Sequence, residues 1–167
     1  MKTKKLTESA LLTAIGVVGG STIYIPVGAS KCFPLQHSIN VLAAVILGPY
    51  YGVTVAFCIS LIRNIMSTGT LLAFPGSMIG ALLAGLVFKY TKKLSLTALA
   101  EVFGTGILGA LAAYPIAAFI LGKKVALFVY IIPFLTSTIG GSLIAYILIK
   151  VLQSSGALKY IETNKVS

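Results

Sequence analysis

Few residues in this sequence have polar side chains that could bind a ligand or take part in catalysis, and these residues lie in two short stretches. The first, from Lys31 to Asn40, places a cation, a thiol, the only histidine and two amides between two long apolar runs. The second, from Arg63 to Thr70, lies beside a break of the same kind. In a bilayer core a polar side chain must face protein or trapped water, because hydrocarbon offers no hydrogen-bond partner. We therefore interpret the first stretch as a loop over a binding pocket to which the second contributes.

The sequence contains few residues that could carry out catalysis. An intramembrane enzyme needs an activated nucleophile, a carboxylate pair or a metal triad. Glu8 and Glu162 lie near the ends of the chain, and Glu101 is the one acid inside an apolar run. His37 has only Cys32 nearby as a soft ligand, which leaves a zinc site two or more ligands short. His37 and Glu101 are expected toward opposite faces of the membrane, so we predict no catalytic residue, no metal and no cofactor.

Several of these residues have two possible roles. Cys32 can pack as a small hydrophobe in its loop, and His37 can either bond within the loop or contact a ligand. Glu101 comes early in its helix, which favours a helix-terminal or interhelical partner over a proton relay. Arg63 can extend to the lipid headgroups or face the pocket. Asn64 points about 100° away from it around a helix, so we expect one of the two to face the pocket.

Composition defines the class of protein. Of 167 residues, 57% are hydrophobic and only 10% are charged, and the mean hydropathy is +1.02. These values indicate an integral membrane protein. The net charge of +10 comes from cations at the ends of apolar runs, where they act as topology signals, so we exclude a nucleic-acid partner. No disulfide is expected, because Cys32 lies in a loop and Cys58 in an apolar run.

The apolar runs predict an all-α bundle of six membrane-spanning helices, over residues 6–24, 38–47, 50–66, 71–90, 96–121 and 125–152, in one membrane domain covering residues 1–167. The opening segment also resembles a signal peptide, with Val27-Gly28-Ala29 as a poor cleavage site. We favour a retained helix, because the segment is long and Ala-rich and every later segment is also hydrophobic.

Charge placement decides whether residues 38–66 form one helix or two, since the first piece is shorter than the roughly 20 residues that span a bilayer. A break at Gly48-Pro49 puts nine cations on the amino-terminal side and four on the other, whereas an unbroken helix gives six against seven. The nine are Lys2, Lys4, Lys5, Lys89, Lys92, Lys93, Lys150, Lys159 and Lys165, and the four are Lys31, Arg63, Lys123 and Lys124. The positive-inside rule therefore favours six spans with both termini cytoplasmic.

Small residues recur at helical spacing, which lets helices approach closely in lipid. The sets are Ala10 with Ala14, Gly76 with Gly80 and Ala84, and Gly109 with Ala113 and Ala117. We expect most of them to pack within the molecule. The pair on the first helix differs, because few large residues lie opposite it and it could face another protein.

Three strings resemble the ThiW family: PVGASKCFPLQHSINVLAAVILGP at 26–49, LIRN at 61–64 and GTLLAFPGSM at 69–78. These proteins are substrate-binding S components of energy-coupling factor (ECF) vitamin transporters, thought to take up the thiazole moiety of thiamine. The resemblance extends over about residues 6–152. It implies a six-helix S-component fold in a prokaryotic cell membrane, with substrate held near the outer face under the loop between helices 1 and 2.

The resemblance also implies partners. The Ala10 and Ala14 face would dock on a transmembrane coupling subunit, the T component, which works with two cytoplasmic ATPases. Glycines at 16, 19 and 20 would extend that face. The chain has no Walker motif, so we expect its partners, and not this chain, to hydrolyse ATP.

The implied ligand is hydroxyethylthiazole, a small heteroaromatic alcohol that needs ring-stacking side chains and a few polar groups. Candidates for stacking are Phe33, Phe74, Tyr114 and Tyr130. Candidates for polar contact are Gln36, His37, Asn40, Arg63, Asn64, Thr68, Thr70 and Ser77. The absence of an outer acidic cage in the sequence argues against intact thiamine, and one outer arginine gives little support to a phosphorylated ligand.

Other functions stay open. An S component for another vitamin or precursor, such as thiamine or a pyrimidine moiety, would have the same architecture. A small oligomeric channel would need a polar stripe along a whole helix, and none of the six has one.

Overall fold

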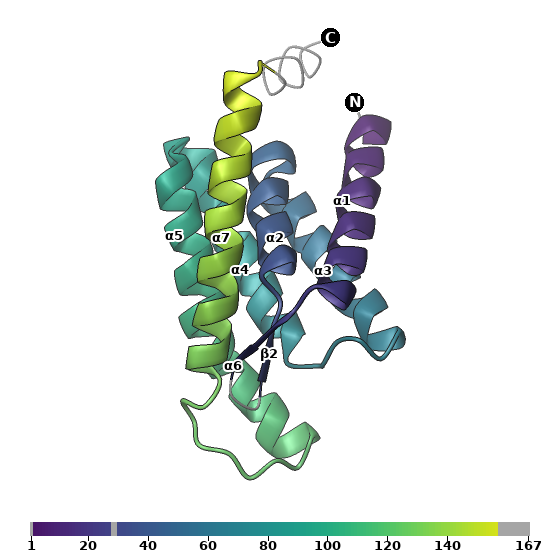
Figure 1. Ribbon diagram of the computed structural model, residues 1–167, viewed down its shortest axis with the longest axis vertical. Coiled ribbons are helices and arrows are strands. Elements are labelled where there is room, and N and C mark those ends of the chain that lie inside the picture. Colours follow the sequence, from purple (N-terminus) through teal and green to yellow (C-terminus); the bar gives the residue numbers. More distant parts are fainter. Residues whose placement is uncertain (1, 28–29, 157–167) are drawn as a thin grey trace.

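The computed structural model describes residues 2–27 and 30–156, which form a bundle of six helical segments (Figure 1). Four are single helices: α1 (Lys2–Thr22), α2 (Pro34–Leu47), α3 (Pro49–Ile65) and α4 (Ala73–Thr91). The fifth runs without interruption through α5 (Leu94–Phe103), the π-helix η1 (Gly104–Gly109), α6 (Ala110–Pro115) and the π-helix η2 (Ile116–Ile120). The sixth is α7 (Ile131–Ser154). The predicted all-helical class is confirmed, apart from one small hairpin.

Three of the described helices are long and apolar enough to cross a membrane: Ala73–Thr91, Leu94–Ile120 and Ile131–Ser154. α2 is apolar but has only 14 residues. At about 1.5 Å per residue it is about 21 Å long, less than the roughly 30 Å of a hydrocarbon core. Pro34, Gln36 and His37 are buried, so the amino-terminal end of α2 lies inside the bundle.

The expected division of residues 38–66 into two helices is confirmed. Gly48 separates α2 from α3 with φ +86° and ψ −179°, a conformation that glycine adopts readily and that other residues avoid. Pro49 follows at the first position of α3, where the missing N–H costs no hydrogen bond. The glycine and the proline together turn the chain back on itself in one residue.

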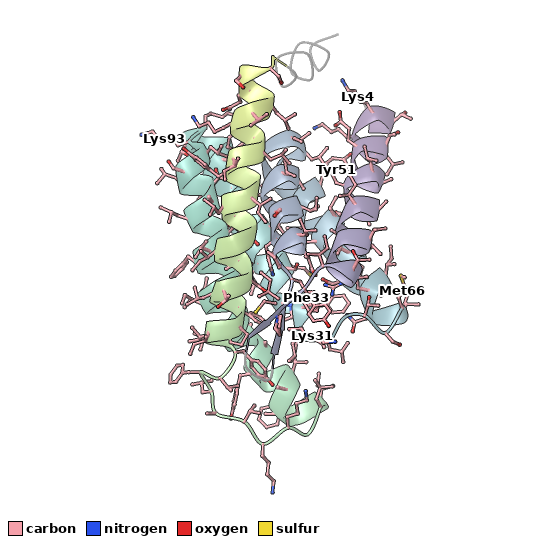
Figure 2. The ribbon with its side chains drawn as sticks, viewed as in Figure 1. Lys4, Lys31, Phe33, Tyr51, Met66 and Lys93 are labelled. Atoms are coloured by element: carbon pink, nitrogen blue, oxygen red, sulfur yellow. The ribbon has the colours of Figure 1, made fainter. Side chains whose placement is uncertain are left out.

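The two ends of the bundle differ. α1 begins and α7 ends at one end, the upper one in Figure 1, and Lys4 and Lys93 lie there in Figure 2. The other end carries the β1 (Ile25–Val27) and β2 (Ser30–Cys32) hairpin, the α3–α4 connection and residues 121–130. The strands are antiparallel, with Ile25 opposite Cys32. They occupy a segment expected to be a loop.

The last helix begins at Ile131, later than the expected residue 125. Gly122 has φ +62°, residues 122–126 have no regular secondary structure, and a turn over residues 127–130 leads into the helix. The residues named above that lie outside the described part of the chain are Gly28, Ala29, Lys159, Glu162 and Lys165.

Small residues let α4 approach the fifth helix closely, as predicted. A Cβ on Gly104 would lie 2.9 Å from the Cα of Gly80, and a Cβ on Gly109 would collide with Gly76. The π-helix η1 carries Gly104 and Gly109, and π-helical segments are frequent at functional sites. The contact places Thr105 directly against α4, where its hydroxyl donates to the Gly76 carbonyl at 3.0 Å.

The expectation that glycines extend the Ala10 and Ala14 face is wrong. Both alanines are exposed, but Gly16 and Gly20 are buried. A Cβ on Gly20 would lie 3.1 Å from Arg63 Nε, and one on Gly19 would lie 2.9 Å from a Leu35 methyl. Residues 14 and 16 are about 200° apart around a helix, so the glycines face the bundle while the alanines face away from it.

Candidate functional site

A cavity of about 550 Å³ opens at the hairpin end of the bundle. Figure 2 labels Phe33 and Lys31 there, where the hairpin leads into α2. The wall comes from α1, the hairpin, α2, the end of α3, the α3–α4 connection, the start of α4, the fifth helix, residues 121–130 and the start of α7. Its residues are Ser21, Tyr24, Lys31, Phe33, Gln36, His37, Arg63, Ser67, Thr68, Gly69, Thr70, Leu72, Ala73, Gly76, Ser77, Thr105, Lys123, Tyr130, Pro133, Phe134 and Ser137.

Eight of the predicted site residues lie on this wall: Phe33, Gln36, His37, Arg63, Thr68, Thr70, Ser77 and Tyr130. The two polar stretches of the sequence thus meet at one cavity. Whether these side chains touch a ligand remains a prediction.

The other four predicted residues do not line it. Asn40 is fully buried behind the wall. Asn64 Nδ2 donates to the carbonyls of Ser60 (2.8 Å) and Thr70 (3.1 Å), which braces the α3–α4 turn. Phe74 turns toward α3, with ring centroids 5.6 Å apart from Phe57. Tyr114 lies on α6, outside the lining residues.

Arg63 is the largest fully buried side chain, with 1% of its surface exposed. Its guanidinium donates to Gln36 Oε1 and, at 2.8 Å, to the Thr68 carbonyl. The guanidinium carbon lies 4.1 Å from the centroid of the Phe33 ring, a cation–π distance. Of the two roles open for Arg63, the structure therefore supports the pocket and not the headgroups.

Gln36 links Arg63 to α4. Its Nε2 donates to the Ser77 hydroxyl at 2.8 Å and to the Ser60 hydroxyl at 3.3 Å. A guanidinium can only donate, so it orients the amide with its oxygen toward Arg63 and its nitrogen toward the serines. The position of the cation is thus fixed from three helices.

His37 and Glu101 meet, against our expectation that they lie toward opposite faces. His37 Nδ1 lies 3.1 Å from Glu101 Oε1. The expectation failed because α2 is short. His37 lies about 15 Å from the Leu47 end of α2 and Glu101 about 10 Å from the Leu94 end of α5, so both reach the middle of the bundle.

Glu101 is fully buried, and its carboxyl group connects α5 to α2. Its Oε1 also accepts from Asn40 Nδ2 at 3.0 Å and from the Thr105 hydroxyl at 2.9 Å. Within the described residues Oε2 has no hydrogen-bond partner. Of the two roles considered for Glu101, the interhelical partner is the one observed. The carboxyl reaches the cavity through His37 and Thr105, which both line it.

Two contacts hold the hairpin against α7. The Phe33 amide donates to the Ser137 hydroxyl at 2.7 Å, and Cys32 Sγ lies 3.3 Å from the Pro133 carbonyl as donor. Cys32 is buried and Cys58 half-buried, and both are free thiols. Cys32 therefore packs as the small hydrophobe that the sequence allowed, and the described residues contain no cluster of metal ligands.

Several wall residues were not identified from the sequence. Tyr24 packs against Phe33 (centroids 6.4 Å apart), and Phe134 packs against Tyr130 (6.2 Å). The others with polar groups are Ser21, Lys31, Ser67, Thr105, Lys123 and Ser137. One signal was available for Thr105: it follows Glu101 by one helical turn, and i,i+4 pairs share a face.

Comparison with known proteins shows first the fold and then the family. The fold matches that of a solved structure described as the S component for biotin from an ECF-type ABC transporter, with a TM-score of 0.63. The two are 20% identical, and the match covers 89% of this chain and 92% of the other. The model of the ThiW family, described as thiamine-precursor transporter protein, matches residues 6–155. The chain therefore belongs to the ThiW family, as the sequence strings indicated. No curated protein sequence matches significantly.

Proposed function

We propose that this protein is the substrate-binding S component of an ECF-type importer and that it takes up hydroxyethylthiazole. Membership of a thiamine-precursor transporter family and an S-component fold support the proposal. The observation that carries it is the cavity at the hairpin end, where aromatic rings and neutral hydrogen-bonding groups surround a space of about 550 Å³. That volume falls in the range of small-molecule sites.

The aromatic side chains explain how a thiazole ring would bind. Phe33 stands on one side of the cavity, and Tyr130 and Phe134 contribute from the start of α7. Offset or edge-to-face contacts with such rings are worth roughly 0.5–1.5 kcal/mol beyond area burial. We assign the thiazole to the space between them.

His37 offers a specific partner for the ligand's hydroxyl. A carboxylate oxygen accepts and cannot donate, so we assign a ring proton of His37 to Nδ1, which lies 3.1 Å from Glu101 Oε1. Because His37 lines the cavity, its Nε2 is left to hydrogen-bond the ligand's hydroxyl. Glu101 is then a positioning residue for His37 and not itself a ligand contact.

The proposed topology has six spans, both termini in the cytoplasm and the cavity open to the outside of a prokaryotic cell. The nine-to-four division of cations supports it. So does the common position of the start of α1 and the end of α7 (Figure 1).

The proposed partners are a T component and two cytoplasmic ATPases. Ala10 and Ala14 are exposed on α1 and would let a partner helix approach closely. Leu11 and Val18 on the same helix are 61% and 63% exposed, and such side chains contact lipid or a partner in a membrane.

Equilibrium binding of the purified protein to a panel of compounds tests the function: hydroxyethylthiazole, thiamine, the pyrimidine moiety of thiamine and biotin. The proposal predicts saturable binding of the thiazole alcohol and weaker binding of the other three. Tight binding of another member together with no response to the thiazole would refute it.

A further inference from the structure

Arg63 is a buried cation without an anionic partner. Its two hydrogen bonds go to an amide oxygen and a backbone carbonyl, both neutral. Its Nε has no hydrogen-bond partner within the described residues. Among the described residues, the only contact between an acidic and a basic side chain joins Glu101 to His37. A buried charge is costly unless it is paired, so the site holds an arginine whose counter-charge has to come from elsewhere.

The charged residues that line the cavity are all cations. Besides Arg63 the wall carries Lys31 and Lys123, and none of the lining residues is acidic. Lys31 lies at the rim with its ammonium 4.6 Å from the centroid of the Tyr24 ring, and both lysines are exposed. A cleft lined by one sign of charge with apolar walls focuses the field and draws in ligands of the opposite sign.

We propose that the cavity is built for an anionic thiazole, one that bears a phosphate ester or a carboxylate, with Arg63 as the buried counter-cation. This inference rests on the proposed function and narrows its substrate class. A planar guanidinium presents five N–H groups, and protein groups use two of them here. The remaining donors suit the paired oxygens of a phosphate or carboxylate. Lys31 and Lys123 steer the anion through the mouth.

From the sequence alone, one outer arginine was little support for a phosphorylated ligand. The structure changes that evaluation in two ways. It brings the lysines of the hairpin and of the segment after η2 to the same cavity, and it buries Arg63 without a carboxylate. Neither fact can be deduced from spacing along the chain.

The test compares three probes by calorimetry on the purified full-length protein: hydroxyethylthiazole, its phosphate monoester and the same alcohol carrying a 2-carboxylate. We expect at least one anionic probe to bind about ten-fold or more tighter than the neutral alcohol, since hydrogen bonds to charged groups are stronger than neutral ones. Higher ionic strength should weaken the anion more than the alcohol.

Substitutions at the three cations measure how much each one contributes to anion binding. Arg63→Gln should remove the preference for the anion, and Arg63→Lys should restore part of it. Because Arg63→Gln can also disturb folding, Lys31→Gln and Lys123→Gln serve as exposed second variants. Each should reduce anion affinity by about two- to five-fold, the range of solvent-exposed pairs. Lys89→Gln, exposed near the other end of α4, is the matched control and should change nothing.

The outcomes distinguish this inference from the proposed function. If the neutral alcohol binds as tightly as both anions, or if the lysine variants bind the preferred anion like the wild type, the anion inference is overturned and the thiazole function stands. If no thiazole probe binds, the proposed function fails and the inference fails with it.

Discussion

Replacing Glu101 with alanine should destabilise the bundle by an amount that the hydrogen bonds allow us to estimate. The substitution leaves His37 Nδ1 without the one partner it has among the described residues, and an orphaned buried donor costs about 1–3 kcal/mol. Asn40 Nδ2 keeps its contact with the Ser77 carbonyl at 3.3 Å, and Thr105 keeps the Gly76 carbonyl at 3.0 Å. These two groups each lose one bond, at about 0.5–1 kcal/mol.

The sum is about 2–5 kcal/mol. Glu101→Gln keeps an accepting oxygen and the side-chain volume, so it should cost about 1 kcal/mol. The assay is thermal and denaturant unfolding of the detergent-solubilised protein, with Glu8→Ala as the matched control, because Glu8 is half-buried on α1 and away from this network. A cycle with His37→Ala should show coupling, since the two side chains contact each other. Equal stability of Glu101→Ala and wild type, or zero coupling, would refute the network.

Three further predictions follow from the same geometry. Ala14→Trp should abolish uptake and leave ligand binding by the isolated subunit near normal, whereas Gly20→Trp, on the inner face, should impair both; parallel loss in Ala14→Trp would mean that its face is internal packing. Gly80→Ala should destabilise the protein by about 1–3 kcal/mol, because a Cβ there collides with Thr105 and lies 2.5 Å from Glu101 Oε2; an unchanged melting temperature would contradict the close contact. A cysteine at Lys92 should resist an impermeant reagent added outside intact cells, and its labelling would overturn the proposed topology.

The sequence was most informative where a local chemical rule applied. Gly48 and Pro49 indicated a break between two helices, and the distribution of cations favoured that break over one continuous helix. Arg63 and Gln36 stood out because polar side chains inside apolar runs need protein partners. That requirement predicted that the two stretches would meet, and they do, through a direct hydrogen bond.

The missed features depend on depth and helix rotation, which spacing does not specify. His37 reaches Glu101 only because α2 begins partway into the bundle. Phe74 was predicted as a stacking ring and Phe134 was not, yet Phe74 turns toward Phe57 while Phe134 lines the cavity. Strands of three residues, such as β1 and β2, are too short to give a periodic signal.

The cavity also changes how the rival enzyme hypothesis is judged. The argument against it was that His37 and Glu101 do not meet, and that argument no longer holds. Membership of a transporter family is now the reason to favour a transporter over an enzyme. The contact between His37 and Glu101 is explained by the positioning of His37 at the cavity wall.

One calorimetric cycle tests the central claim, that this cavity binds the thiazole alcohol through its wall residues. Hydroxyethylthiazole and its analogue without the hydroxyl are each titrated into the wild type and into His37→Ala. The account predicts that loss of the hydroxyl weakens binding to the wild type by about ten-fold to a hundred-fold and hardly affects binding to His37→Ala. Asn40→Ala, behind the wall, should weaken both ligands alike. No binding of the alcohol to the wild type, or an equal effect of the hydroxyl in wild type and His37→Ala, would contradict the assignment.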